Sequence, residues 1–468
     1  MILTLLNLVR QVTPGHANGA MDEPGISPAR PEPATASLKG PPAPMLTSPP
    51  ARASTGALVL DLIRTHPSIS RVELADRTGL TAATITHVVR ELMTDGLVHE
   101  TGRVRSKGGS PRRLLELESE VLYAVGVQME RCTTTIVITD FTGRQIAMTG
   151  LRGVGQGTPQ ETLRTLAEHI EALLAHARIP RDRVLGVGLV THGPQDRARG
   201  MILTPQPTAP WREFPLTTTL SDLLHLPVLL ENDATAAAIG EQWAGSLDVD
   251  TFGVIYMASG VGGGVITDSE VYRGRASNTV EIGHLPIDPA GPECICGSRG
   301  CVEAVAGPVS VVQRAMSSDL GDRLELRGIE DETLADFERI ARAANRGDDA
   351  ARALLDESAR HLGTAAVALL NLFDLDTVVL AGPAFATAGP LYAARIDQAL
   401  QRGALARLLR PVGARLSSNV RAAAAVGGAL IVLRSPLVRA QPGTASPAVA
   451  PAPATTARPV AYRAVALG

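Results

Sequence analysis

The chain has 468 residues, which is long for one domain and enough for two or three. Hydrophobic residues make up 45% of the chain and aromatic residues only 3%, so the core must be built from aliphatic side chains. The formal net charge of −3 excludes a protein that is basic throughout, and any affinity for nucleic acid must come from a local patch.

Both ends of the chain are predicted to be disordered extensions, over residues 1–52 and 438–468. Apart from a short apolar start, they are rich in proline, alanine, glycine and serine and show no apolar period. Such segments bury too little apolar surface to offset the entropy lost on ordering. The apolar start lacks the charged region of a signal peptide, and later apolar runs fall short of the ~20 residues that a membrane span needs. We therefore expect a cytoplasmic protein with no membrane partner.

Residues 53–117 are predicted to form a winged helix-turn-helix. A first helix is expected around residues 58–65. Ser70, followed three residues later by Glu73, is typical of a capping box at the start of a second helix. Gly79 supplies the permissive turn that ends this helix.

A third helix is expected from Thr81, which can cap its first turn. Apolar side chains at helical spacing would face the core, namely Ile85, Val88, Val89 and Leu92. The other side carries small, polar or basic residues, which suits a helix that lies in a DNA major groove. The candidate DNA contacts on it are Thr81, Ala83, Thr86, His87 and Arg90.

A short strand at 97–100 leads into a basic loop at 101–113, which contains no acidic residue. Its basic side chains include Arg103, Arg105 and Lys107, and they would lie on DNA phosphates as a wing. A helix-turn-helix also occurs as a plain packing motif, and a basic run is often only a solvated loop. The order of cap, glycine turn, polar face and basic wing favours DNA binding.

Residues 118–437 are predicted to form an α/β domain, because strand-like runs alternate with helical stretches. The expected strands are 122–127, 134–139, 184–190, 228–230, 252–257 and 377–380, and the clearest helices are 162–177 and 350–372.

A candidate metal site follows in this domain. Three of the four cysteines are clustered, and a histidine precedes them; the set is His284, Cys294, Cys296 and Cys301. A Cys₃His set is used by closed structural zinc sites, and four protein ligands leave no position for a catalytic water. The alternative is a group of buried free thiols. Four cysteines are too few for a disulfide-stapled fold, which fits a reducing compartment.

Several motifs together resemble the ROK family (repressors, open reading frames, kinases). They are EIGH at 281–284 followed by CICGSRGCVE, ENDA at 231–234, SGVGGGV at 259–265, and ELADRTGLTAATITHVVRELMTDGLV at 73–98. The resemblance covers residues 55–435 and is strongest to the branch of xylose- and N-acetylglucosamine-responsive repressors. It implies an actin-like, hexokinase-like fold, with two α/β lobes and a sugar in the cleft between them.

The resemblance also implies which residues contact the sugar: Asn232, Asp233, Glu281, His284 and Glu303, with His284 also holding the zinc. Carboxylates, an amide and an imidazole supply the donors and acceptors that sugar hydroxyls need. The ENDA motif alone would be read as a helix cap. His192 stands in a loop that departs from the family pattern, and it is either a sugar contact or a plain loop residue.

In the kinase branch, Asp233 would be the base that accepts the proton of the attacking hydroxyl. Family kinases also carry an acidic residue, two glycines and a threonine at the end of the first strand, where backbone amides hold phosphates. This chain has GVQMERC at 126–132 instead, and Pro383 replaces the second glycine of a later pair and offers no amide. We expect no useful kinase activity; the alternative is an active ROK sugar kinase with an appended DNA-binding domain.

The expected function is therefore that of a DNA-binding transcriptional regulator, a repressor of carbohydrate-metabolism genes, whose affinity for operator DNA is controlled by a sugar. Its winged helices would be paired in a homo-oligomer, a dimer or a tetramer, to match two half-sites. A further alternative is a DNA-binding protein that responds to no ligand and uses the second domain only for assembly.

Overall fold

The computed structural model describes residues 55–66, 68–104, 112–155, 157–205, 207–243, 247 and 249–435. The two predicted disordered extensions lie outside the described residues, and so do Arg105 and Lys107 of the predicted wing. None of the described helices is long and apolar enough to cross a membrane.

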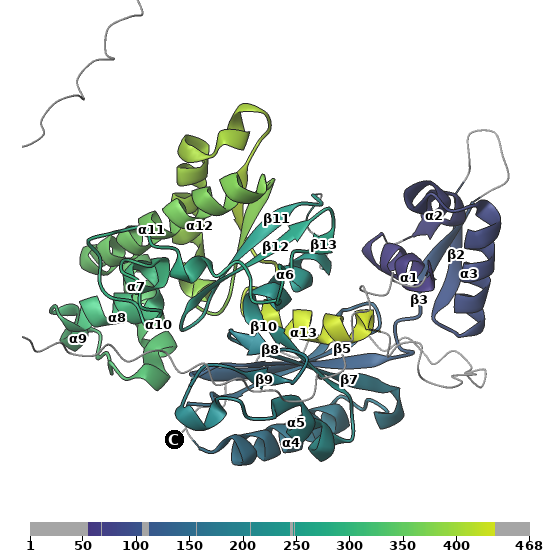
Figure 1. Cartoon of the computed structure of the whole chain (residues 1–468), viewed down its shortest axis with the longest axis horizontal. Coiled ribbons are helices and arrows are strands. Elements are labelled where there is room, and N and C mark those ends of the chain that lie inside the picture. The colour runs from purple at the N-terminus through teal and green to yellow at the C-terminus, as the bar shows by residue number, and fades with distance from the viewer. Residues whose placement is uncertain are drawn as a thin grey trace, which may run out of the picture. The chain divides into compact units, whose positions relative to one another are not determined.

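The N-terminal domain packs three helices against a small antiparallel sheet in the order β1-β3-β2 (Figure 1). Its elements are α1 (Thr55–Thr65), β1 (Ile69–Ser70), α2 (Arg71–Thr78), α3 (Ala82–Thr94), β2 (Val98–Val104) and β3 (Arg112–Leu117). The prediction of a loop over 101–113 is wrong at both ends, because β2 continues to Val104 and β3 begins at Arg112, where the two residues pair. The predicted wing is therefore a true β-hairpin.

The second domain contains two five-stranded sheets with the same topology. In each, three consecutive strands form an antiparallel meander, and two later strands add in parallel beside the first. The first lobe holds β4 (Tyr123–Met129), β5 (Thr133–Asp140), β6 (Gln145–Arg152), β7 (Val184–Thr191) and β10 (Val228–Asn232). The second lobe holds β11 (Phe252–Met257), β12 (Val261–Thr267), β13 (Glu270–Val271), β14 (Thr377–Ala381) and β15 (Gly413–Leu416). This is the two-lobed α/β architecture that the resemblance implied.

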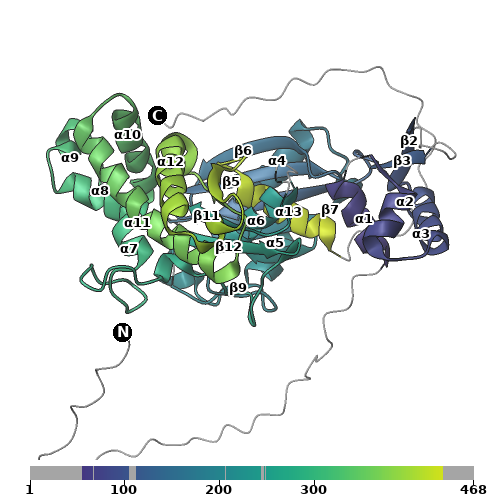
Figure 2. The same cartoon turned by 90° about the horizontal axis from the view of Figure 1, so that it is seen from above.

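Helices cover the outer faces of both sheets. On the first lobe these are α4 (Pro159–His176) and α5 (Leu216–Leu224), whose apolar faces share a core with β4, β5 and β7. On the second lobe, α8 to α10 gather at one end in both views (Figures 1 and 2). The helices of that lobe are α7 (Val302–Ala306), α8 (Pro308–Met316), α9 (Leu320–Arg323), α10 (Thr333–Asn345), α11 (Asp349–Phe373) and α12 (Phe385–Gly403). A small ribbon of β8 (Gln195–Asp196) and β9 (Met201–Ile202) completes the first lobe.

Two helices, α6 (Asp233–Trp243) and α13 (Ala423–Arg434), lie between the sheets (Figure 1). The alanines of α6 pack with β11 and β14 of the second lobe, whereas α13 packs on β4 and β7 of the first lobe. The two helices cross at Gly427, where an added Cβ would lie 1.7 Å from the carbonyl oxygen of Ala236. Their backbones therefore touch, and the lobes meet through this helix pair.

Most predicted strands and helices are present with shifted ends. The strand predicted at 228–230 continues to Asn232, and the glycine-rich run at 259–265 is a tight turn followed by β12. The sequence analysis did not predict β6 or β15. β15 has only four residues and β6 alternates weakly, so neither carries a clear apolar signal.

Candidate functional site

The residues predicted to contact a sugar come together where the ends of β10 and β7 approach the glycine turn before β12. A Cβ added at Gly193, in the loop after β7, would lie 3.4 Å from both Asn232 Nδ2 and Glu281 Oε1. A Cβ added at Gly262 would lie 3.8 Å from Asp233 Oδ1. Glycines therefore line the space that these polar side chains face.

Asn232 and Asp233 stand at the junction of β10 and α6. Asn232 Oδ1 accepts a hydrogen bond from the backbone N–H of Thr235 at 3.0 Å, so the helix-cap interpretation is correct for this oxygen. Its Nδ2 faces Gly193 in the loop after β7 and remains a donor for a ligand. Asp233 Oδ1 accepts from the N–H of Ala234 at 2.7 Å. Desolvation, with a further contribution from the Glu130 carboxylate, raises the pKa of Asp233 to about 8.

From the second lobe, Glu303 approaches the glycine turn before β12 and Glu281 approaches the loop after β7. Glu303 Oε2 accepts from the N–H of Val261 at 2.8 Å, and a Cβ at Gly260 would lie 2.5 Å from this oxygen. Burial raises the pKa of both carboxyls. His284 lies between these acids and the cysteines, because its Nδ1 is 3.4 Å from Cys294 Sγ. His192 is half-buried in the loop after β7, and its role as a sugar contact stays a prediction.

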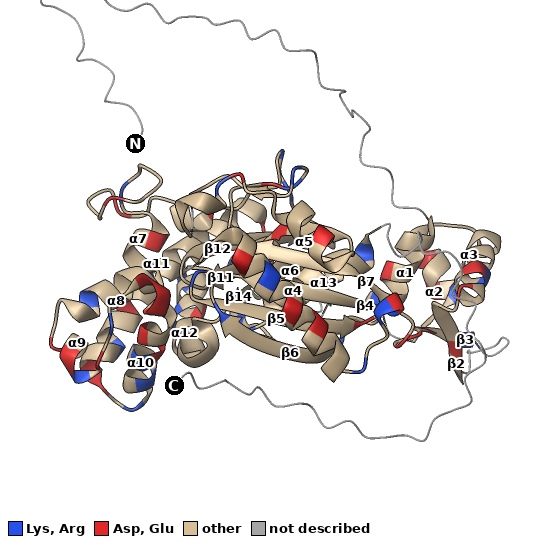
Figure 3. Ribbon diagram, turned by 90° about the horizontal axis from the view of Figure 1, so that it is seen from below, with Lys and Arg blue, Asp and Glu red and all other residues tan. Residues whose placement is uncertain are grey.

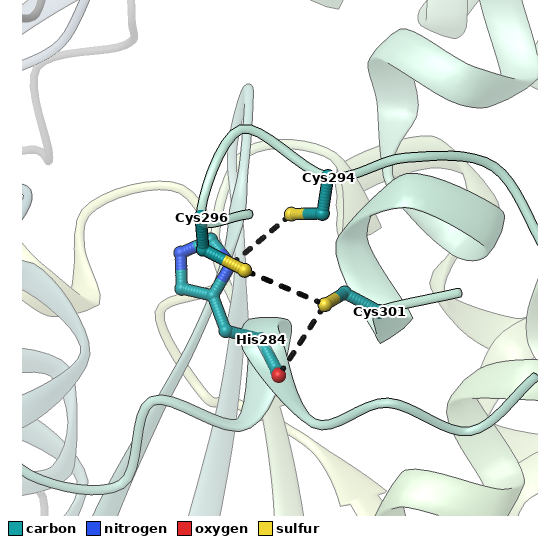
Figure 4. A group of neighbouring side chains, drawn as sticks. All are labelled: His284, Cys294, Cys296 and Cys301. Carbon is teal, nitrogen blue, oxygen red and sulfur yellow. Dashed lines mark hydrogen bonds between the residues drawn. The ribbon is translucent and has the colours of Figure 1, made fainter. Parts of the chain in front are cut away.

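The four predicted metal ligands form one cluster (Figure 4). Their ligand atoms all lie within 4.8 Å of one another. Cys296 Sγ lies 3.7 Å from Cys301 Sγ. A tetrahedral zinc with ordinary bond lengths would separate two sulfurs by about 3.7 Å and a sulfur from a nitrogen by about 3.5 Å. The cluster therefore has the composition and spacing of a site that could hold a metal ion.

The loop that carries the cysteines is folded by its own backbone. Cys294 N–H donates to Ser298 O at 2.8 Å and Gly300 N–H to Pro292 O at 2.8 Å. Gly300 has a φ of 60°, and a Cβ there would lie 1.7 Å from the carbonyl oxygen of Asp288. Only glycine fits this turn, which brings Cys301 back to the other candidate ligands.

The predicted DNA-binding helix has the expected local structure. The Ser70–Glu73 capping box is present, with Ser70 N–H donating to Glu73 Oε2 at 2.8 Å, and Gly79 has a φ of 67°. Thr81 caps α3 by accepting from the N–H of Thr84 at 3.1 Å. The four predicted inward residues of α3 are all buried.

The outward face of α3 is open to solvent for four of the five predicted DNA contacts, Thr81, Ala83, His87 and Arg90, and half-buried for Thr86. Basic and acidic positions both occur on this helix (Figure 3). His87 Nε2 lies 3.3 Å from Glu91 Oε1. Thr86 donates its hydroxyl to the Ala82 carbonyl at 2.7 Å.

The sequence analysis missed an acid at the base of the wing. Glu100 pairs with Arg71 at 2.7 Å and also accepts a hydrogen bond from Arg113 across the β2–β3 hairpin. The wing loop itself contains no acid, yet two arginines near its base are neutralised. The register of the hairpin could have revealed this contact, because Glu100 stands opposite Leu115 and diagonal to Arg113.

The sequence analysis also missed two buried networks that link the first lobe to the second. Glu231 is 1% exposed and pairs with Arg197 at 3.0 Å and Arg273 at 2.7 Å. Glu130 is 5% exposed, and its Oε1 accepts a hydrogen bond from the Tyr256 hydroxyl at 2.7 Å. No local sequence signal specifies these partners, which come from elements far apart in the chain.

A cation from the winged helix is buried against the second domain. The side chain of Arg64 in α1 is 2% exposed, and its guanidinium carbon lies 4.3 Å from the Trp243 ring centre and 4.9 Å from that of Phe141. Asp61 pairs with Arg64 at 3.2 Å and with Arg434, at the end of α13, at 3.3 Å. Burial lowers the pKa of Arg64 to about 10.

Known proteins match both parts of the chain. Residues 124–435 match the ROK family, and residues 58–99 match a winged helix-turn-helix DNA-binding family. The chain is 29% identical over 334 residues to the xylose repressor of Caldicellulosiruptor bescii, which covers 70% of this chain and 82% of that one. It is 26% identical over 333 residues to the DNA-binding transcriptional dual regulator NagC of Escherichia coli, with 70% and 79% covered.

Solved structures share the fold. A ROK family transcriptional regulator, a homologue of the Escherichia coli MLC protein, aligns over 83% of this chain and 98% of its own, with 25% identity and a TM-score of 0.65. A ROK family glucokinase from Streptomyces griseus, in complex with glucose and AMPPNP, aligns over 66% and 98%, with 28% identity and a TM-score of 0.56. With the family match spanning most of the described residues and a winged helix-turn-helix ahead of it, the chain belongs to the ROK family.

Proposed function

We propose that this chain is a transcriptional repressor of carbohydrate-metabolism genes, which binds operator DNA through its winged helix and releases it when a sugar binds between the two lobes. The observation that carries the proposal is the convergence of five polar side chains, Asn232, Asp233, Glu281, His284 and Glu303, around glycine-lined space at the lobe junction.

This set of side chains suits a polyhydroxylated ligand. The Asn232 amide supplies a donor, and the carboxyl groups accept hydrogen bonds from hydroxyls, or donate one when protonated. A concave site with a few placed polar groups is the usual form of a small-molecule site. The same elements come from both lobes, so a bound sugar would favour one relative orientation of the lobes.

Helix α6 offers a direct route from this site to the winged helix. It begins at Asp233 and ends at Trp243, about 16 Å away for 11 residues at an ordinary helical rise. Trp243 stacks on Arg64 of α1. Asp61, one turn before Arg64 in α1, pairs with Arg434 of α13. A sugar that binds one lobe arrangement more tightly would shift both contacts together.

The cysteine cluster is proposed to hold one structural zinc ion through His284, Cys294, Cys296 and Cys301. Four protein ligands would complete the coordination and fix both the cysteine loop and the His284 ring. Because His284 belongs also to the proposed sugar site, the metal would orient one sugar contact without taking part in chemistry.

Phosphoryl transfer is not part of the proposal. Backbone amides that could hold phosphates after β14 are used within the protein: Gly382 N–H donates to Val420 O at 2.9 Å and Ala384 N–H to Met257 O at 3.1 Å, while Pro383 has none. Phosphoryl transfer depends mainly on positioning and on electrostatic stabilisation of the phosphates. ATP-dependent phosphorylation of a sugar that is abolished by Asp233→Asn would overturn this part.

The active form is proposed to be a homo-oligomer, a dimer or a tetramer, so that two winged helices meet two half-sites. Three leucines are open to solvent, one near the end of α11 and two after α12, which supports contact with a second copy. Leu372, Leu408 and Leu409 are 74%, 74% and 85% exposed. Light scattering of the purified full chain tests this, and a monomer that still binds a two-half-site operator would contradict it.

The test is a mobility-shift titration of the full chain against DNA from upstream of its own and neighbouring genes, with and without neutral and N-acetylated sugars. We expect specific binding that one sugar releases. Glu303→Ala should bind the same DNA but ignore the sugar, and Glu270→Ala, an exposed carboxylate on β13, serves as the matched control. Specific binding that no sugar alters would favour the assembly-only alternative.

A further inference from the structure

The most unusual feature of the cleft is a buried acid at the end of β4. Glu130 Oε1 accepts a hydrogen bond from the Tyr256 hydroxyl, and the Gln128 amide donates to both groups. Glu130 Oε2 is fully buried and has no hydrogen-bond partner among the described residues. A buried carboxylate oxygen without a partner costs free energy unless a ligand, water or proton satisfies it.

This acid stands beside the proposed sugar site. Its hydrogen-bond partner Tyr256 stands opposite Gly262 in the β11–β12 pair, and a Cβ added at Gly262 would lie 3.8 Å from Asp233 Oδ1. The Glu130 charge also contributes to the raised pKa of Asp233. Glu130 comes from the first lobe and Tyr256 from the second, so this hydrogen bond joins the two lobes.

Three arginines in the described part of the chain, all close to these acids in the sequence or paired with a neighbour of Asn232, already hold carboxylates. Arg131, the next residue, binds Glu330 at 2.6 Å and Asp331 at 3.1 Å. Arg197 and Arg273 are both held by the buried carboxylate of Glu231. Arg131 is therefore engaged by two acids, whereas Arg197 and Arg273 share one carboxylate. Glu130 itself has no basic partner among the described residues.

We infer that the cleft selects a sugar that carries no phosphate on the hydroxyl nearest Asp233, and that Glu130 is the side chain that enforces this choice. The inference rests on the proposed function and names the ligand class of the same site. A hydroxyl at that position can donate a hydrogen bond to Glu130 Oε2. A phosphate there carries about −1.5 to −2 charges, only accepts hydrogen bonds when fully ionised, and is repelled.

The test measures binding directly, by calorimetry on the full chain purified with zinc. It is run at about pH 8.5, because Glu130 must be ionised to repel a phosphate and burial raises its pKa to about 7. The ligands are D-glucose and N-acetylglucosamine, each compared with its 6-phosphate, in excess Mg²⁺ so that the phosphate has a cation available. One like-charge contact at about 5 Å and an effective dielectric constant near 20 corresponds to roughly 250-fold in the dissociation constant. We expect a neutral sugar to bind at least that much more tightly than its phosphate.

Glu130→Gln keeps the size of the side chain and removes its charge. We expect this variant to lower the ratio of the two dissociation constants, phosphate over neutral sugar, by about tenfold or more. The control Glu270→Gln, which removes an exposed carboxylate on β13, should leave this ratio unchanged. Retained affinity for the neutral sugar would show that the variant is folded. If the variant does not fold, the comparison of each sugar with its phosphate in the wild-type chain still tests the selection.

The outcomes separate the two ideas. A phosphate ester that binds as tightly as its parent sugar overturns the selection but leaves a sugar-responsive repressor. An unchanged preference in Glu130→Gln overturns the role of Glu130. If no sugar and no phosphate binds while operator binding persists, the sensor half of the proposed function fails, and the inference fails with it.

Discussion

Replacing Trp243 by leucine is expected to uncouple the sugar site from DNA binding. The Trp243 ring covers the guanidinium of Arg64, whose side chain is 2% exposed and is paired only through Asp61 among the ion pairs described. A desolvated cation on an indole ring contributes about 2 kcal/mol. If this contact exists in only one lobe arrangement, its loss reduces the effect of the sugar on operator affinity by up to about 30-fold.

The assay is a mobility-shift titration at saturating sugar and without sugar, for wild type and Trp243→Leu. The ratio of the two operator dissociation constants should shrink in the variant, while calorimetry finds sugar affinity changed far less. Tyr272→Leu, which removes a 41% exposed ring in the second lobe, is the matched control. Full release of DNA by sugar in Trp243→Leu would refute the route through α6.

Four further outcomes are expected. Glu303→Ala should abolish sugar binding, because the carboxylate is held by the Val261 N–H toward the cleft; unchanged affinity in calorimetry would remove Glu303 from the site. Chelation, or Cys301→Ser, should lower the melting temperature and release one zinc per chain by elemental analysis, since structural zinc stabilises only the folded loop; a chain that holds no zinc would contradict the metal site. Arg90→Ala should cost about 1–3 kcal/mol of operator affinity if it reads a base, or reduce the salt slope by about 1 if it binds a phosphate. Burial raises the pKa of Glu130 to about 7, so the folded state holds this proton more tightly than the unfolded state. The free energy of unfolding therefore falls as pH rises from about 4.5 to 7. Glu130→Gln should therefore gain up to about 3 kcal/mol over wild type across this window in urea unfolding, and a difference that does not grow with pH would contradict the buried charge.

Local signals were sufficient for the winged helix. Capping at Ser70 and Thr81, the turn at Gly79 and the apolar period of α3 are set by neighbours within four residues, so the sequence alone predicts them. The wing was less accurate, because strand ends depend on cross-strand pairing. Its neutralising acid, Glu100, lies before the basic run and reaches it only through the hairpin.

The residues proposed to contact a sugar were predicted through resemblance to a family, and the fold brings them together. Their neighbours were not predictable in the same way. Glu130 and Tyr256 are 126 positions apart, and Arg64 meets Trp243 from a different domain. No periodicity reports such contacts, because they arise when separate elements pack.

The way in which α6 and α13 are placed has a consequence for the integrity of the molecule. α6 follows the last strand of the first lobe yet packs on the second, and α13 follows the last strand of the second lobe yet packs on the first. The last helix of each lobe therefore packs on the sheet of the other lobe. Cleavage of the chain between residues 243 and 252 would separate each sheet from the helix that packs on its inner face. The two fragments should therefore be insoluble apart and regain their fold only when mixed. The lobes are thus interlocked partners, which neither proteolysis nor recombination can exchange as independent modules.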